Sequence, residues 1–87
     1  MYTIEFSGRF LKGLRKIDPA NRRIIAEWIN ANLLETEEPR QNGRALKGQL
    51  KGLWRYRVGQ YRIIAKIDDG QLLLLMLDVD HRKDVYR

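Results

Sequence analysis

Three arginines lie close together in the second half of the sequence, where side chains alternate as they do in β-strands. Arg55 and Arg57 are two residues apart, and Arg62 follows Gly59-Gln60, a pair that suits a two-residue type II′ turn. With that turn, Arg57 faces Arg62 across a hairpin, and all three guanidinium groups share one face of the sheet. Opposed like charges destabilise a hairpin by up to about 1 kcal/mol, so we expect either an anion between them or a neighbouring carboxylate. Planar guanidinium groups match phosphate oxygens, and the pattern therefore predicts a phosphate-binding site.

A second group of reactive side chains, His81, Arg82 and Tyr86, follows the last predicted strand. We expect a loop there to direct these side chains toward the same sheet face. His81 changes charge near neutral pH and is the candidate for proton transfer. Arg82 adds a guanidinium, and Tyr86 offers a ring for stacking on a base and a hydroxyl for hydrogen bonding. The alternative for His81 is an exposed loop residue without a chemical role.

The positive charge of the chain is concentrated in one third of its length. The 87 residues include 17 basic and 11 acidic ones, a net charge of +6. Between Arg40 and Lys66 there are eight basic residues and no acidic one, so no carboxylate of this window can neutralise the arginines. Such a patch is expected of a protein that binds nucleic acid, although a merely solvated surface is the alternative. Besides the three arginines, the expected nucleic-acid contacts are Arg44, Lys47, Lys51 and Lys66.

Several other chemistries find little support in the composition. There is no cysteine and only one histidine, which excludes thiolate chemistry and multi-histidine metal sites. Asp78 and Asp80 could share a strand face as Mg²⁺ ligands do, but a two-metal nuclease site needs more carboxylates. No phosphate-binding Gly-Lys-Ser/Thr motif is present. We therefore expect no metal and no cofactor. No apolar stretch is long enough to cross a membrane and no signal peptide opens the chain, so a cytoplasmic protein is expected.

The first half of the chain predicts a strand and two helices. Residues 2–6 alternate as a short strand, and Ser7 can cap a helix whose apolar face includes Phe10, Leu14 and Ile17. Asp18 is a suitable cap for a second helix, with Pro19 at its first position and an end near residue 35. The apolar stripe of this second helix consists of Ile24, Ile25, Trp28, Ile29 and Leu33.

The second half predicts three antiparallel strands at 53–58, 61–67 and 71–79. Asp69-Gly70 is the sequence that a type I′ turn prefers, and it would connect the last two strands. The run from Leu72 to Leu77 is apolar on both faces, which places the last strand inside the sheet. No linker or repeat divides the chain. We expect one α+β domain over residues 1–87, with an N-terminal strand and a helical hairpin packed on a mostly antiparallel sheet.

Residues 45–67 read "ALKGQLKGLWRYRVGQYRIIAKI" and residues 79–87 read "VDHRKDVYR". These two segments resemble the RelE/ParE superfamily of bacterial toxin–antitoxin toxins, and its RelE branch most closely. The resemblance spans nearly the whole chain and implies a small basic toxin with a RelE-like, microbial-RNase-like fold. Such toxins cut messenger RNA in the ribosomal A site without a metal, by attack of a ribose 2′-hydroxyl on the adjacent phosphate. The resemblance also implies a RelB-like cognate antitoxin, which neutralises the toxin and joins it in a complex that represses their operon. The toxin would thus meet operator DNA only through the antitoxin.

The resemblance also implies roles for individual residues. Arg55 and Arg57 match basic catalytic positions, Arg62 the arginine that stabilises the phosphate, Arg82 a late arginine, and Tyr86 the terminal tyrosine that orients the nucleotide. Some relatives have lysines at the first two positions, and arginine does not readily serve as a general base. This makes His81 a candidate for that role. Asp80 stands where many relatives have glycine.

Two other functions remain open at this level. One is a ParE-like toxin that inhibits DNA gyrase by binding it. The other is a non-catalytic module whose basic face only holds nucleic-acid phosphates.

Overall fold

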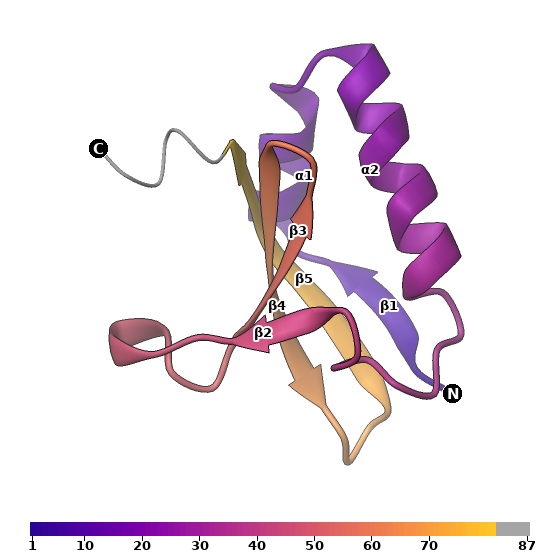
Figure 1. Cartoon of the computed structure of the whole chain (residues 1–87), viewed down its shortest axis with the longest axis vertical. Coiled ribbons are helices and arrows are strands. Elements are labelled where there is room, and N and C mark those ends of the chain that lie inside the picture. Colours follow the sequence, from indigo (N-terminus) through magenta and orange to yellow (C-terminus); the bar gives the residue numbers. More distant parts are fainter. Residues whose placement is uncertain (82–87) are drawn as a thin grey trace.

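The computed structural model of this chain describes residues 1–81, which form one sheet of five strands with two helices on one of its faces (Figure 1). In chain order the elements are β1 (Thr3–Phe6), α1 (Gly8–Arg15), α2 (Pro19–Asn32), β2 (Gly43–Ala45), η1 (Gly48–Leu50), β3 (Trp54–Val58), β4 (Tyr61–Asp68) and β5 (Leu73–His81). The strands lie side by side in the order β1-β5-β4-β3-β2. Among the strand pairs within residues 1–81, only β1–β5 is parallel. The α+β class and the mostly antiparallel sheet are thus confirmed.

Both helices begin at the residues that their sequence predicts. The Ser7 hydroxyl accepts a hydrogen bond from the backbone N–H of Phe10 at 3.0 Å, and Asp18 accepts one from that of Asn21 at 3.1 Å. Each side chain satisfies a backbone donor that the first helical turn leaves free. Pro19 follows as the first residue of α2. Helix α2 ends at Asn32, three residues before the expected boundary.

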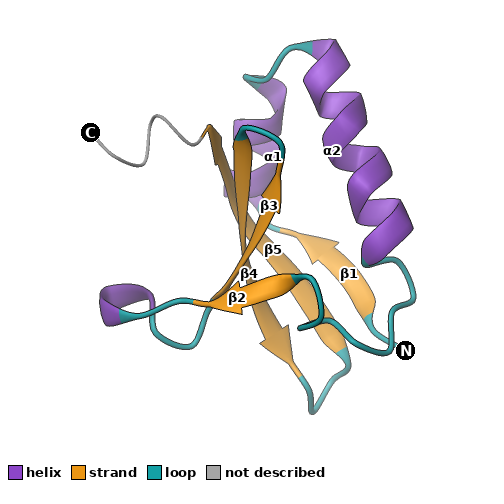
Figure 2. Cartoon of the chain, in the orientation of Figure 1, coloured by secondary structure: helices purple, strands orange, loops and turns teal. Residues whose placement is uncertain are grey.

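The hydrophobic core lies between the helices and the sheet (Figure 2). Phe10, Ile25 and Leu33 contribute from the helical side and are almost fully buried. Trp28 also packs against this core, with its ring 5.7 Å from that of Tyr56. Ile24, which we expected in the apolar stripe of α2, is 52% exposed. The buried stripe of this helix is therefore narrower than the sequence indicates.

The two hairpins of the sheet differ from one another. Gly59-Gln60 forms the expected two-residue link, with Val58 paired to Tyr61 and a positive φ of 60° at Gly59, as a type II′ turn requires. The type I′ turn expected at Asp69-Gly70 is wrong. Asp68 pairs with Leu73, so four residues form the loop, and only Leu72 among them has a positive φ. The Asp68 carboxylate accepts hydrogen bonds from the backbone and side chain of Gln71, which fixes this longer loop.

Strand β5 contains a β-bulge that decides which way its last residues point. Ala65 pairs with Met76 and Ile64 with Asp78, so Leu77 is the extra residue. The buried residues of the strand are accordingly Leu74, Met76 and Val79, not every second residue throughout. The extra residue shifts the alternation by one position. Each side chain after Leu77 therefore lies on the face opposite to the one that strict alternation predicts.

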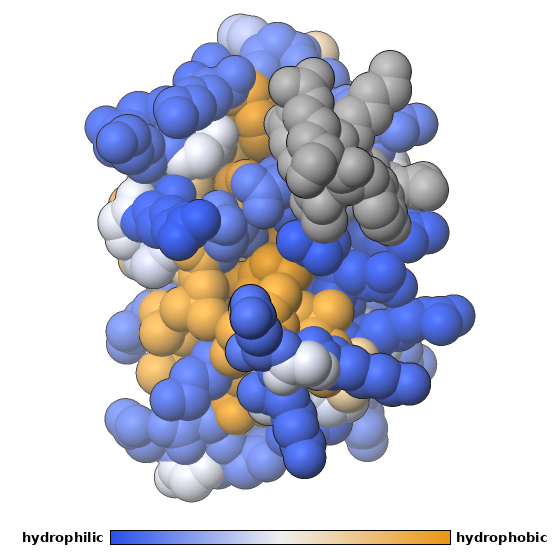
Figure 3. All heavy atoms as spheres, turned by 90° about the vertical axis from the view of Figure 1, so that its left-hand side faces the viewer, coloured by the Kyte–Doolittle hydropathy of each residue, from blue (hydrophilic) through white to orange (hydrophobic). Residues whose placement is uncertain are grey.

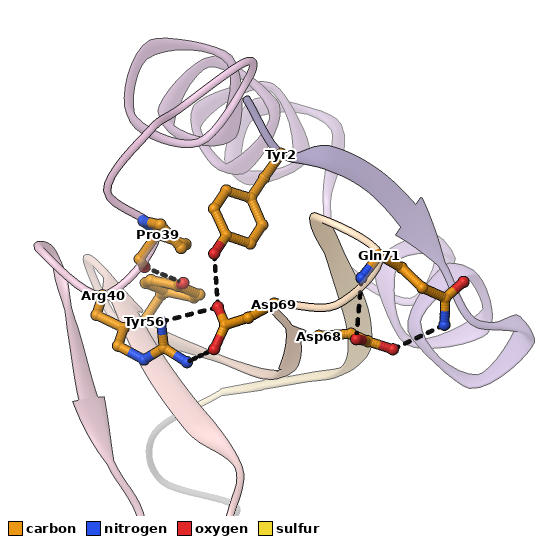
Figure 4. A network of polar contacts seen from close by, with 7 residues as sticks. All are labelled: Tyr2, Pro39, Arg40, Tyr56, Asp68, Asp69 and Gln71. Atoms are coloured by element: carbon orange, nitrogen blue, oxygen red, sulfur yellow. Dashed lines mark hydrogen bonds and ion pairs between the residues drawn. The ribbon is translucent and has the colours of Figure 1, made fainter.

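A set of polar contacts joins the start of the chain to the last hairpin (Figure 4). Tyr2 Oη donates to Asp69 Oδ1 at 2.5 Å, and Arg40 donates from Nη1 and Nη2 to the same carboxylate at 3.1 and 2.8 Å. We call this group the Tyr2–Asp69–Arg40 clasp. The guanidinium of Arg40 also lies 5.4 Å from the ring centroid of Trp54. The clasp holds the segment before β2 against the sheet.

Candidate functional site

The sheet face opposite the helices carries the arginines that the sequence singles out. Arg57 pairs with Arg62 across β3 and β4, as predicted, and Arg55 lies two residues from Arg57 on the same face. We refer to Arg55, Arg57 and Arg62 as the arginine cluster and to this side of the sheet as the open face. The alternating partners Tyr56 and Val58 are buried in the core, which fixes the orientation of the arginines.

Strand β2 extends this positive surface. Arg44 pairs directly with Arg55, which makes a second pair of opposed like charges next to the first. Arg44, Arg55 and Arg57 line a cavity of about 390 Å³ together with Asn42. Sequence reasoning missed Asn42, because its place at the site depends on the short strand β2, which has no sequence signal of its own. A cavity with three guanidinium groups and an amide suits an anion.

Close packing holds β2 in position. Gly43 pairs with Tyr56, and a Cβ at this glycine would lie only 2.9 Å from Cε1 of the tyrosine ring. The Tyr56 hydroxyl donates to the backbone carbonyl of Pro39 (Figure 4). Burial raises the pKa of Tyr56 to about 12, so this hydroxyl keeps its proton at neutral pH. The core tyrosine thereby positions Arg44 beside the arginine cluster.

Arg62 has an unsatisfied hydrogen-bond donor. Its Nε is buried and has no partner among residues 1–81. In the same part of the chain, no carboxylate lies within 4.0 Å of the guanidinium nitrogens of Arg57 or Arg62 as an ion-pair partner. A buried donor left unsatisfied costs about 1–3 kcal/mol. The arrangement favours an anionic ligand that accepts from these groups.

A carboxylate nevertheless stands next to the cluster, contrary to the expectation from the acid-free window. Asp80 of β5 pairs directly with Arg62, so its side chain lies on the open face. The bulge at Leu77 is the reason, because strict alternation from Met76 would turn Asp80 toward the helices. The sequence gives no signal for this bulge, because every residue from Leu72 to Leu77 is apolar.

His81 does not lie in a loop and is not on the open face. It is the last residue of β5 and pairs with Tyr61, whose ring packs against the core on the helical side. The two rings meet edge to face, 5.2 Å apart. His81 and Tyr61 line a cavity of about 980 Å³ beside α1, and Asp78 and Asp80 line the same cavity. By register, the His81 side chain therefore lies on the opposite face of the sheet from the arginine cluster. Arg82 and Tyr86 lie outside the described residues.

The remaining basic residues of the window take two kinds of position. Lys47 and Lys51 flank η1 and, like Lys66 on β4, are exposed. Arg40 belongs to the clasp described above and is thereby committed to Asp69. Figure 3 looks onto the side of the molecule away from α2 and shows hydrophobic atoms in its middle, with hydrophilic side chains around them. By register, the open face includes the apolar residues Ile64, Leu73 and Leu75.

The sequence and fold of this chain match those of known toxins. A family model described as the ParE toxin of the type II toxin–antitoxin system parDE matches residues 4–86. Toxin RelG of Mycobacterium tuberculosis is 34% identical over 86 residues, which cover 99% of this chain and 97% of that protein. These matches define a class, the toxins of type II toxin–antitoxin systems. The chain belongs to the RelE/ParE superfamily of these toxins.

Solved structures agree with this assignment. A chain of the toxin–antitoxin complex RelBE2 from Mycobacterium tuberculosis superposes with a TM-score of 0.84 and 32% identity, over 93% of this chain and 98% of that one. A chain of the intact RelBE toxin–antitoxin complex from E. coli shares the fold with a TM-score of 0.71 at 20% identity, over 93% and 96% of the two chains. Among residues 1–81, no helix is both long and apolar enough to cross a bilayer.

Proposed function

We propose that this toxin is a metal-independent endoribonuclease that cleaves messenger RNA on the ribosome and so arrests translation. The observation that carries the proposal is the direct pairing of Arg57 and Arg62 on the open face, with the buried Nε of Arg62 unsatisfied. Two opposed guanidinium groups without a carboxylate between them provide donors for the non-bridging oxygens of one phosphate. Similarity to toxins named RelG and RelE supports this reading.

The chemistry that suits such a site is attack of a ribose 2′-hydroxyl on the adjacent phosphorus. Negative charge grows on the phosphate oxygens as the pentacoordinate state forms. Arg57 and Arg62 are paired on neighbouring strands, so a phosphate bound between them would meet donors where this charge develops. Preorganised donors of this kind stabilise a transition state without reorganisation, and each contributes about 10²–10³-fold in rate.

The other basic residues would hold the RNA along the same side of the molecule. Arg44 adjoins the cluster, while Lys47, Lys51 and Lys66 are exposed and able to reach phosphates of messenger or ribosomal RNA. Phosphate contacts of this kind position a nucleic acid and make its binding depend on salt. They are proposed as binding residues that take no part in the chemical step.

We also propose a RelB-like antitoxin as the partner of this chain. Several similar structures are complexes of a RelE toxin with a RelB antitoxin, which supports this choice. An acidic antitoxin segment that folds on binding would be attracted to the open face and would screen the arginine cluster. Operator DNA would be bound through the antitoxin. If the purified complex left Arg57 and Arg62 accessible and active, inhibition by masking would be wrong.

The test of the nuclease proposal is expression of the chain alone in bacteria. Growth and protein synthesis should stop within minutes, and primer extension should map new 5′ ends within translated messages. Intact messages in arrested cells would overturn the proposal.

A second candidate function is inhibition of DNA gyrase, because the matching family model is that of the ParE toxin. In that case messages stay intact, and supercoiling of plasmid DNA is lost in the arrested cells. A module that only holds phosphates would produce neither result. The primer-extension and supercoiling assays on the same culture therefore separate the three functions.

A further inference from the structure

Cleavage by a 2′-hydroxyl needs a group that accepts its proton, and the arginine cluster cannot supply it. Guanidinium groups stay protonated at any physiological pH. His81, the candidate from the sequence, lies on the helical side of the sheet with its ring against that of Tyr61. The proton acceptor must therefore be sought among the other side chains of the open face.

Asp80 contributes a carboxylate to the cross-strand row of the open face that contains Arg57 and Arg62. Arg57, Arg62 and Asp80 are consecutive cross-strand neighbours on β3, β4 and β5. Neighbouring strands lie about 4.8 Å apart, and Asp80 is one strand away from Arg62. A phosphate bound by the two guanidinium groups would therefore bring the adjacent ribose close to the Asp80 carboxylate. The side chain is partly buried, which limits its freedom to turn away.

The surroundings of Asp80 also make its carboxylate a stronger proton acceptor. Burial raises the pKa of Asp80 above the ordinary value of 3.8, and the neighbouring carboxylate of Asp78 raises it further. The guanidinium groups of Arg62 and Arg9 act in the opposite direction, more weakly. A higher pKa makes a carboxylate a stronger proton acceptor while it is still ionised at neutral pH. Other charged or titratable groups of the adjoining cavity are Lys12, Lys16 and Asp18 of the helical segment, and His81.

We propose that Asp80 is the general base of the cleavage reaction, an inference that rests on the proposed nuclease function. Its carboxylate takes the proton of the ribose 2′-hydroxyl while the 2′-oxygen forms a bond to the adjacent phosphorus. The bond from phosphorus to the 5′-oxygen of the next nucleotide breaks, and that oxygen takes a proton from water. The products are a 2′,3′-cyclic phosphate and a 5′-hydroxyl, and Asp80 returns its proton to solvent.

The test is single-turnover cleavage on ribosomes saturated with toxin, measured against pH for the wild type and for Asp80→Asn. The wild-type rate should rise with pH through an acidic limb above pH 3.8 and then level off. Asp80→Asn keeps the shape of the side chain but accepts no proton, so its rate should fall by about 10²–10⁴-fold and lose the acidic limb. A lower rate with an unchanged acidic limb would mean that Asp80 only positions Arg62, and would overturn the proposal.

Asp78→Asn provides a second test that leaves Asp80 in place. Because the Asp78 carboxylate raises the pKa of Asp80, its removal should move the acidic limb to lower pH and leave the plateau rate within a few fold. An acidic limb that stays in place would count against Asp80 as the titrating group. If the wild type cleaves RNA and Asp80→Asn cleaves it at a rate within threefold of the wild type, the general-base role of Asp80 is overturned, while the nuclease function stands. Absence of cleavage by the wild type would overturn the nuclease function as well.

Discussion

Arg57 and Arg62 stand directly opposite each other at the end of the β3–β4 hairpin, one pair away from its two-residue turn. The two-residue turn keeps the two residues opposite each other, so the folded state contains the repulsion between their positive charges. A bound phosphate would offset that repulsion, because both guanidinium groups could donate hydrogen bonds to it.

Loss of either guanidinium should affect the chemical step. Arg57→Ala and Arg62→Ala are each expected to slow single-turnover cleavage on saturated ribosomes by about 10²–10³-fold, because each removes a donor to the transition state. Arg62→Lys should fall between wild type and Arg62→Ala, since it keeps the charge but not the planar donors. Arg23→Ala, on the exposed side of α2, is the matched control and should cleave normally. Rates of Arg57→Ala and Arg62→Ala equal to that of the control would contradict the site.

His81→Ala should change cleavage much less. The imidazole contacts Tyr61 on the helical side of the sheet, so we expect a loss of less than about tenfold and a pH–rate profile of unchanged shape. The measurement is the same single-turnover assay across pH. A loss of about 10²-fold or more together with a flattened profile would restore His81 as the proton-transfer group.

Binding to ribosomes should weaken steeply as salt increases. Each phosphate contact releases counterions, and the double variant Lys47→Ala/Lys51→Ala should reduce the slope of log Kd against log salt by roughly 1.5. Cleavage at saturating toxin should be preserved, because both lysines lie outside the arginine cluster. Titrations at several salt concentrations measure the slope. A slope equal to that of the wild type would show that these lysines do not contact RNA.

The clasp should make stability depend on pH. Hydrogen bonds from Arg40 and then from Tyr2 lower the pKa of Asp69 below 3.8. A carboxyl group whose pKa is lowered by folding stabilises the folded state. This stabilisation is fully present above the unfolded-state pKa and is lost as pH falls through the folded-state pKa. Asp69→Asn should therefore be less stable than wild type at pH 7, and the difference should shrink as pH falls below 3.8 and vanish once pH is below the folded-state pKa of Asp69. Urea unfolding at each pH measures it, with the exposed Glu27→Gln as control.

Gly43→Ala should disturb the site through the core. The added methyl group would meet the Tyr56 ring at 2.9 Å, and β2 would have to move away from β3. We expect a loss of about 1–3 kcal/mol in the free energy of unfolding, with weaker RNA binding because Arg44 moves with the strand. Gly8→Ala is the control, since a Cβ there meets nothing within 4 Å. A Gly43→Ala protein as stable as wild type would contradict this packing argument.

The parts of the fold that sequence predicts well are those decided by neighbouring residues. The caps Ser7 and Asp18 and the turn at Gly59 depend on local hydrogen bonds or a local φ angle, and all three are confirmed. The hairpin then fixes the Arg57–Arg62 pairing, so the centre of the candidate site follows from local rules as well.

The parts that sequence predicts poorly depend on distant partners. The Asp69-Gly70 turn fails because the side chains of Asp68 and Asp69 are engaged by Gln71, Arg40 and Tyr2 in a four-residue loop. The bulge at Leu77 is set by pairing with β4, yet it alone decides that Asp80 and not His81 shares a face with the arginines. Placing Asp80 at the site therefore required the tertiary structure.

The position of β5 has a consequence for how the toxin is made. This strand is synthesised after the other four strands of the sheet, but it lies between β1 and β4. While the nascent chain still lacks it, β1 has no neighbour and the edge of β4 is unpaired. Contacts so distant in sequence form slowly, because a long loop must close before they are made. Under the proposed nuclease function, a nascent toxin would lack the Arg62–Asp80 pair, and the ribosome that makes it would be spared until β5 has entered the sheet.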